Sequence, residues 1–104
     1  MTVRRRLPDR RPSITFDIEA FTLRFTVTVS PFEDDAVGEI FIQNHKADSG
    51  AGIMASDSAI AASLALQYGC PADVLRKALC RDAHGNASGP LGIALDALRA
   101  ERTS

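Results

Sequence analysis

The sequence has few cysteines and histidines, little Tyr or Trp, and no long apolar run. It contains no Trp, one Tyr, two Cys and two His among 104 residues. No apolar run approaches the ~18–20 residues that a membrane helix requires. The basic start of the chain is not followed by an apolar segment, so we expect no secretory signal and a cytoplasmic location. With 45% hydrophobic residues, the chain is expected to be neither wholly disordered nor fibrous.

The two cysteines, Cys70 and Cys80, are ten residues apart. At the ends of one straight helix they would be separated by about 15 Å. A disulfide needs Cα atoms within about 7 Å, so we expect no bond between them. The same distance excludes a zinc site shared by the two cysteines. Adding His45 and His84 gives no set of residues with the spacing of zinc ligands. We therefore expect no metal and no other cofactor.

The length predicts one domain, because a complete (β/α)₈ barrel enzyme needs roughly 200 residues or more. The net charge of −1 conceals a basic start and a mildly acidic remainder. We expect residues 1–12 to form a flexible basic arm, kept extended by its prolines, and residues 13–101 to form the domain. Such an arm can bind phosphates, an acidic partner or its own acidic body. Its basic residues are Arg4, Arg5, Arg6, Arg10 and Arg11.

Apolar residues alternate with polar ones through the first half of the domain, as in half-buried strands. The apolar positions are even-numbered from Ile14 to Ile18 and odd-numbered from Phe21 to Val29. This change of phase predicts a tight turn or a bulge at Glu19-Ala20, and of the two we favour a hairpin turn. A third strand is predicted over residues 37–43, and three consecutive strands favour an antiparallel meander.

Three helices are predicted in the second half. The first begins after Asp48 or Ser49 and ends at Gly69, with large apolar residues spaced by +7, +4 and +4. The Ala and Ser residues around them allow close approach of another element, so no side of this helix need face solvent. A second helix spans residues 71–81, and a third spans residues 90–99. The large apolar residues of the first helix are Ile53, Ile60, Leu64 and Tyr68; the second is expected to bury Val74, Leu75, Ala78 and Leu79, and the third to bury Leu91, Leu95 and Leu98.

Together these elements predict an α+β fold. A three-stranded antiparallel meander is followed by three helices packed on one face of the sheet.

One segment between the last strand and the first helix has the composition of an anion site. Lys46 supplies a point charge, and Ser49, Gly50 and Gly52 let backbone N–H groups face a phosphate at a helix N-terminus. The full phosphate-loop signature is absent, so an ordinary helix start is the alternative.

Other candidate chemistry is sparse. His45, Asp48 and Ser49 are neighbours in one turn and lack a nucleophile elbow. Cys70 lies before a helix N-terminus, which favours either a reactive thiol or an inert, packed cysteine. Asp57 is expected to make a structural contact or a ligand contact.

Several of these segments match one known family. They are Gly38-Glu-Ile-Phe-Ile, Lys46, Ser49-Gly50 and Ser63-Leu-Ala-Leu-Gln-Tyr-Gly-Cys-Pro, followed by Ser88-Gly-Pro-Leu. In these motifs the chain resembles the TSCPD domain, which occurs at the carboxyl end of adenosylcobalamin-dependent ribonucleotide reductases and also as a small separate protein. The resemblance covers roughly residues 14–98, so residues 13–101 are expected to form a single TSCPD-like domain.

The resemblance implies a role in deoxynucleotide metabolism and DNA replication. Reductases of that family need a radical cysteine, a redox cysteine pair and a carboxylate inside a large barrel. This chain has two cysteines and no room for a barrel, so we do not expect it to catalyse the reaction by itself.

The sequence therefore favours a non-catalytic binding or regulatory module. Its expected partners are a ribonucleotide reductase or a nucleotide, and the Ala- and Ser-rich helix and the open sheet face suggest a homodimer. The alternative is a nucleic-acid-associated protein that uses the arginine arm.

Overall fold

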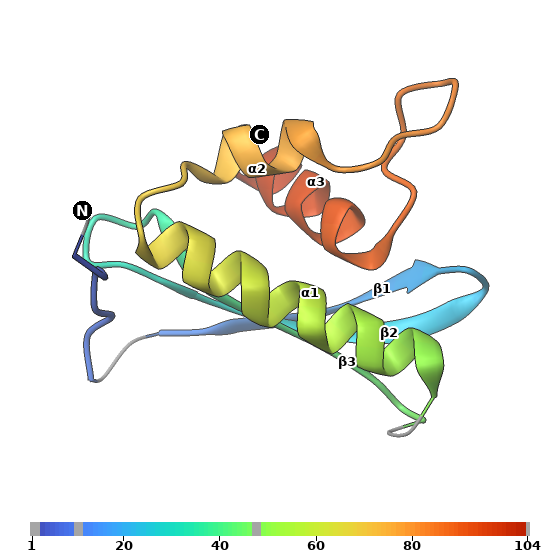
Figure 1. Cartoon of the computed structure of the whole chain (residues 1–104), viewed down its shortest axis with the longest axis horizontal. Coiled ribbons are helices and arrows are strands. Elements are labelled where there is room, and N and C mark those ends of the chain that lie inside the picture. Colours follow the sequence, from blue (N-terminus) through green and yellow to red (C-terminus); the bar gives the residue numbers. More distant parts are fainter. Residues whose placement is uncertain (1–2, 10–11, 47–48, 104) are drawn as a thin grey trace.

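A computed structural model describes residues 3–9, 12–46 and 49–103, with side chains described as far as residue 100. The chain forms one three-stranded sheet in the order β1-β2-β3, followed by three helices, so the predicted α+β class is confirmed (Figure 1). The elements are β1 (Ile14–Ala20), β2 (Leu23–Pro31), β3 (Val37–Asn44), α1 (Gly50–Gln67), α2 (Ala72–Ala78) and α3 (Pro90–Thr103).

The hairpin between β1 and β2 turns at Phe21-Thr22, so the predicted turn at Glu19-Ala20 is wrong. Ala20 pairs with Leu23, and both loop residues have positive φ angles of 56° and 62°. A two-residue loop pairs an even-numbered residue with an odd-numbered one, which puts both on the same face. The change of phase therefore occurs inside the loop, two residues later than expected.

The next turn is closed by tight packing around Phe32. Its backbone N–H donates to Ala36 O (2.7 Å), and its C=O accepts from Asp35 N–H (3.0 Å). A Cβ at Gly38 would lie 2.9 Å from the Phe32 ring. Glycine is thus required at this position in β3, because the ring occupies the space of a side chain.

The core lies between one face of the sheet and helices α1 and α3, with all three helices on that side of the sheet (Figure 1). Its most deeply buried large side chains are Phe25, Val27, Ile40 and Ile42. Helix α3 contributes Leu91, Leu95 and Leu98, as predicted.

Helix α2 differs from its prediction. It is shorter, because the backbone is extended at Leu79 (φ −76°, ψ 159°). It buries none of its residues, and Val74 in particular is exposed. The helix therefore lies on α3 as an outer element, and Leu75 and Leu79 pack against the core half-buried and not fully buried as predicted.

Two polar side chains of α1 fasten the helix to the outer edge of β3. Ser63 Oγ accepts the Ile40 N–H (2.9 Å) and lies 3.0 Å from Ile40 O. One turn later, Gln67 Nε2 donates to Gly38 O (3.0 Å). Both side chains are buried, at 6% and 2% exposure. Since an unpaired edge strand is open to further pairing, these bonds both close the edge and fix the rotation of α1.

We expect Ser63→Ala to lower the free energy of unfolding by about 1–3 kcal/mol, because it leaves the buried Ile40 N–H without its acceptor. Urea unfolding of the full chain measures the change. Ser58→Ala is the matched control, since Ser58 Oγ donates to Ala55 O within the same helix. Equal effects of the two substitutions would contradict the assigned role of Ser63.

Candidate functional site

Large apolar side chains line the outer side of α1. Ile53, Met54, Ile60, Leu64 and Tyr68 are between 41 and 75% exposed, and we call them the α1 stripe. Half-exposed side chains of this size leave roughly 100 Å² each, so the α1 stripe presents on the order of 500 Å² of apolar surface. Patches of this size on single chains often mark contact sites for other molecules.

The α1 stripe faces outward because mainly small residues, together with Leu66 and Gln67, occupy the inner side of the helix. The inner positions are Gly52, Ala55, Ala59, Ala62, Ser63, Leu66 and Gln67. At Gly52, a Cβ would lie 2.9 Å from Ser49 Oγ and 3.2 Å from Asn44 Cβ. The small residues permit the close approach that the sequence predicted. The expectation that no side of α1 need face solvent is wrong for the chain by itself.

Charge is sparse along this helix. Asp57 is the one charged residue of the 18 in α1, and it is exposed. It lies between Ile53 and Ile60 at helical spacing, on the outer side of α1. Because Asp57 is exposed, its carboxylate does not pay the free-energy cost of burial. A contact between Asp57 and a ligand stays a prediction.

The predicted anion site lies at the start of α1. Ser49 is the N-cap: its Oγ accepts the Gly52 N–H (3.0 Å) and its C=O accepts the Ile53 N–H (3.0 Å). Lys46 is exposed, and its C=O accepts the Ser49 N–H (3.1 Å). The alternative cap, Asp48, is outside the described residues. Lys46, Ser49, Gly50 and Gly52 are thus neighbours, and anion binding by them stays a prediction.

The described part of the arginine arm lies against the body, beside the β2–β3 turn (Figure 1). Arg4 Nε donates to Gln67 Oε1 (2.7 Å), and the Arg5 N–H donates to Gln67 O (2.6 Å). The sequence allowed the arm to contact phosphates, an acidic partner or the body of its own domain. The last of these contacts is formed.

Arg5 makes two further contacts with that turn. Its Nη2 lies 3.1 Å from Asp34 Oδ2, and its guanidinium carbon lies 4.0 Å from the centroid of the Phe32 ring. Hydrogen bonds from the Ala36 N–H and then from Arg5 lower the pKa of Asp34. Arg6 is exposed, and Arg10 and Arg11 are outside the described residues. Nucleic-acid binding by the arm stays a prediction.

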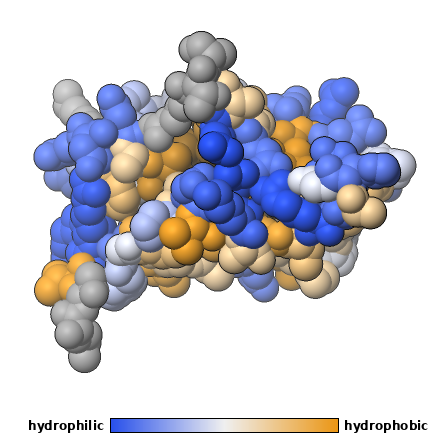
Figure 2. Space-filling model, turned by 90° about the horizontal axis from the view of Figure 1, so that it is seen from above, coloured by the Kyte–Doolittle hydropathy of each residue, from blue (hydrophilic) through white to orange (hydrophobic). Residues whose placement is uncertain are grey.

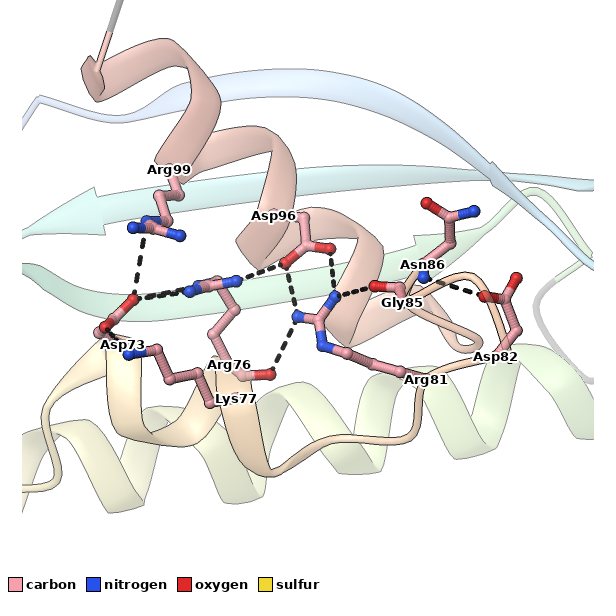
Figure 3. A network of polar contacts seen from close by, with 9 residues as sticks. All are labelled: Asp73, Arg76, Lys77, Arg81, Asp82, Gly85, Asn86, Asp96 and Arg99. Atoms are coloured by element: carbon pink, nitrogen blue, oxygen red, sulfur yellow. Dashed lines mark hydrogen bonds and ion pairs between the residues drawn. The ribbon is translucent and has the colours of Figure 1, made fainter.

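An ionic network joins α2 to α3 (Figure 3). Asp96 on α3 accepts from both terminal nitrogens of Arg81 (2.8 and 2.9 Å) and from Arg76 Nη1 (3.2 Å). Arg76 also bonds to Asp73, which pairs with Lys77 at 3.2 Å. Figure 2 looks down on this side of the molecule and shows hydrophilic surface across its middle.

These contacts change the acidities of the groups involved. The hydrogen bonds from Arg81 are the main cause of the lowered pKa of Asp96. The hydrogen bonds from Arg76 are the main cause of the lowered pKa of Asp73. Hydrogen bonds to Asp73 and Asp96 raise the pKa of Arg76, and Asp96 raises that of Arg81. Because α2 buries none of its residues, we assign the network the structural task of holding it on α3.

No catalytic arrangement is apparent in the part of the chain that the structure describes. Cys70 and Cys80 are both free and lie outside α2, so the single-helix premise for their separation does not hold. Cys70 is half-buried, and its thiol donates to Pro71 O (3.6 Å). Its reactivity stays a prediction.

Between α2 and α3 there is a cavity of about 240 Å³. It is lined in part by Val37, Leu95 and Leu98, and it falls below the roughly 300–1,000 Å³ of ordinary ligand sites. Within residues 3–9, 12–46 and 49–103, no cluster of three or more His, Cys, Asp or Glu could hold a metal ion. None of the helices described there is long and apolar enough to span a membrane.

We expect Asp96→Asn to loosen α2 and to weaken the acid dependence of stability. A carboxylate whose pKa is lowered by folding stabilises the folded state above its ordinary pKa of 3.8, and this contribution is lost as the pH falls further. Hydrogen exchange at pH 7 should therefore accelerate in α2 more than in α1. The slope of unfolding free energy below about pH 4 should become shallower.

Asp17→Asn serves as the control for this substitution, because Asp17 is an exposed carboxylate that accepts from Thr26 Oγ1. An equal loss of protection in α2 with Asp17→Asn, or no loss with Asp96→Asn, would contradict the role given to the network.

Comparison with known proteins gives one group of relatives, all named vitamin B12-dependent ribonucleotide reductase. The protein from Streptantibioticus cattleyicolor is 38% identical over 69 residues, which are 66% of this chain and 12% of the relative. Those from Bradyrhizobium diazoefficiens and Agrobacterium fabrum are 36% and 38% identical over 73 and 68 residues, or 70% and 65% of this chain.

The chain thus spans 5–12% of the length of these relatives, as a related domain would. Its similarity to part of these reductases is confirmed, whereas its membership of the TSCPD family stays a prediction. The chain matches no known family profile, and no solved structure matches it.

Proposed function

We propose that this chain is a non-catalytic protein-binding module of deoxynucleotide metabolism that associates with a ribonucleotide reductase. The observation that carries the proposal is the α1 stripe, an exposed apolar face on a helix with one charged residue. Similarity to part of the reductases supports the metabolic setting and a cytoplasmic location.

Several polar side chains in the motifs that resemble the TSCPD domain have structural roles, which favours a binding function over a catalytic one. Ser63 and Gln67 are buried and bonded to β3, and Ser49 caps α1. None of these three is free to act on a substrate. The exposed apolar residues beside them are left as the contact surface.

Apolar burial supplies the free energy for such an association. A contact that covers the α1 stripe removes on the order of 500 Å² of this chain's apolar surface from water, at roughly 25 cal/mol per Å². Part of that gain is lost to the entropy of association, so we expect a reversible complex.

We expect the full chain to bind purified vitamin B12-dependent ribonucleotide reductase from Streptomyces coelicolor, a relative that is 38% identical over 69 residues, in a saturable manner. Biolayer interferometry with the chain immobilised measures the affinity. The double variant Ile60→Asp, Leu64→Asp should weaken binding at least tenfold, because it places two carboxylates in the apolar contact.

Val74→Asp is the matched control, since Val74 is an equally exposed aliphatic residue on α2. It should leave the affinity within twofold of the unmodified chain. Absence of binding to the reductase would contradict the proposed partner. Binding that survives the double variant would contradict the assignment to the α1 stripe.

A nucleotide partner is tested separately by thermal shift against nucleoside di- and triphosphates. A saturable shift that Lys46→Ala removes would move the function to the start of α1.

A further inference from the structure

We propose that a groove between the arginine arm and the open face of the sheet binds a nucleoside phosphate. The inference goes beyond the proposed function and does not rest on it, because protein binding is assigned to the α1 stripe. We call this site the arm groove.

The arm groove consists of two hollows that adjoin. The first, of about 710 Å³, lies over β2 and β3 on the side of the sheet away from the helices, and Phe41 is part of its lining (Figure 1). The second, of about 580 Å³, lies between the arm and the end of α1, and its lining includes Arg4 and Arg6. Asp9 and Glu39 line both, so the two carboxylates lie where the hollows meet. Each hollow has the size of an ordinary ligand site.

The chemical groups of the arm groove follow a fixed order along β3. Phe41 and Glu39 are two residues apart in this strand, so they are on the same face and about 7 Å apart. The residue before Glu39 is Gly38, whose carbonyl accepts from Gln67 Nε2 (3.0 Å). Gln67 Oε1 in turn accepts from Arg4 Nε (2.7 Å). The order is therefore an aromatic ring, then carboxylates, then guanidinium groups.

A nucleoside phosphate presents matching groups in the same order, namely a planar base, a sugar with hydroxyls and a phosphate. A base stacks on an exposed aromatic ring, and Phe41 is 44% exposed. Carboxylates accept hydrogen bonds from ribose hydroxyls, as Asp9 and Glu39 are placed to do. Guanidinium groups bind phosphate oxygens through paired N–H donors. The order accounts for the presence of both charge signs in one groove.

A buried hydroxyl in the first hollow has no partner among the described residues. Ser30 is 6% exposed, and its Oγ makes no hydrogen bond within that part of the chain. No fully enclosed side-chain oxygen or nitrogen there lacks a partner, so the Ser30 Oγ opens into the hollow that it lines. Ser30 pairs with Glu39 across the two strands. We therefore assign its hydroxyl to the sugar of the ligand.

The phosphate end is arranged before a ligand binds. Buried Gln67 holds Arg4 through Nε, and the two terminal nitrogens of Arg4 make no hydrogen bond or ion pair with a described residue. Arg6 is exposed and has no such contact either within residues 3–9, 12–46 and 49–103. The last carbonyl of α1, Gln67 O, accepts from the Arg5 N–H. Its lone pairs are thus engaged by the arm and do not face the anion.

Charge on the rest of the open face favours a single nucleotide over a nucleic-acid strand. Asp17 and Glu19 of β1 are exposed, and they alternate with the core-facing Ile18 and Ala20. A strand that continued across the sheet would place further phosphates beside these carboxylates, which repel them.

Isothermal titration calorimetry of the full chain with ADP, GDP, CDP and UDP in turn tests the inference. We expect saturable binding of at least one of them, with a dissociation constant on the order of 100 µM, because the open groove contacts only part of the ligand. Inorganic pyrophosphate should bind at least about tenfold more weakly, since it lacks the base that stacks on Phe41.

Two substitutions locate the site. Arg6→Ala and Phe41→Ala should each weaken binding at least about fivefold, because they remove a phosphate contact and the stacking ring. Arg24→Ala and Phe21→Ala are the matched controls, since both residues are exposed and neither lines the arm groove. They should leave the affinity within about twofold. Circular dichroism melts confirm that each variant is folded.

Ser30→Ala separates ligand binding from stability. It should weaken binding about threefold, because one hydrogen bond to the sugar is lost. The free energy of unfolding should stay unchanged, since the hydroxyl bonds no described residue. A loss of stability like that of Ser63→Ala, with unchanged affinity, would contradict the role given to Ser30.

Four outcomes would overturn the inference. They are absence of saturable binding up to about 5 mM, equal binding of pyrophosphate, tighter binding of a short oligonucleotide, and loss of binding in Lys46→Ala but not in Arg6→Ala. The double variant Ile60→Asp, Leu64→Asp should bind the nucleotide normally. Failure of the arm groove would therefore leave reductase binding through the α1 stripe standing, and the reverse also holds.

Discussion

The bonds from Ser63 and Gln67 to the edge of β3 determine how the rest of this molecule is arranged. They satisfy backbone groups of Ile40 and Gly38 that would otherwise face solvent at an unpaired edge. Because the two residues are one helical turn apart, they also fix which side of α1 faces the sheet. Gln67 extends the link further, since its side-chain oxygen accepts from Arg4 and its carbonyl from the Arg5 N–H.

The orientation of α1 has a consequence for function. The side with the two polar residues also carries Ala55, Ala59, Ala62 and Gly52, so the large apolar residues other than Leu66 are directed outward. Stability of the chain and availability of a contact surface therefore come from one constraint. A relative of part of a much larger enzyme can in this way keep a stable core and still present an apolar face to another protein.

The fold could be predicted from the sequence because its strands and helices have different hydrophobic periods. The side of α1 that faces outward could not, since Ala on one side and Ile and Leu on the other both read as apolar. The turn at Phe21-Thr22 could not be predicted, because neither residue favours positive φ as Asn or Gly would. The ion pair between Asp96 and Arg81 joins residues 15 apart in the sequence and could not be predicted from it. The ion pairs of Asp73 with Arg76 and Lys77 could have been, because these residues have helical spacing.

Hydrogen exchange of the Ile40 amide tests the central constraint most directly. Ile40 lies in an edge strand, where outward-facing amides ordinarily exchange through small local openings. We predict that its exchange is as slow as that of Val27 in the central strand β2, because Ser63 Oγ holds the N–H inside the protein. Exchange as fast as that of the exposed amides at the outer edge of β1 would contradict it.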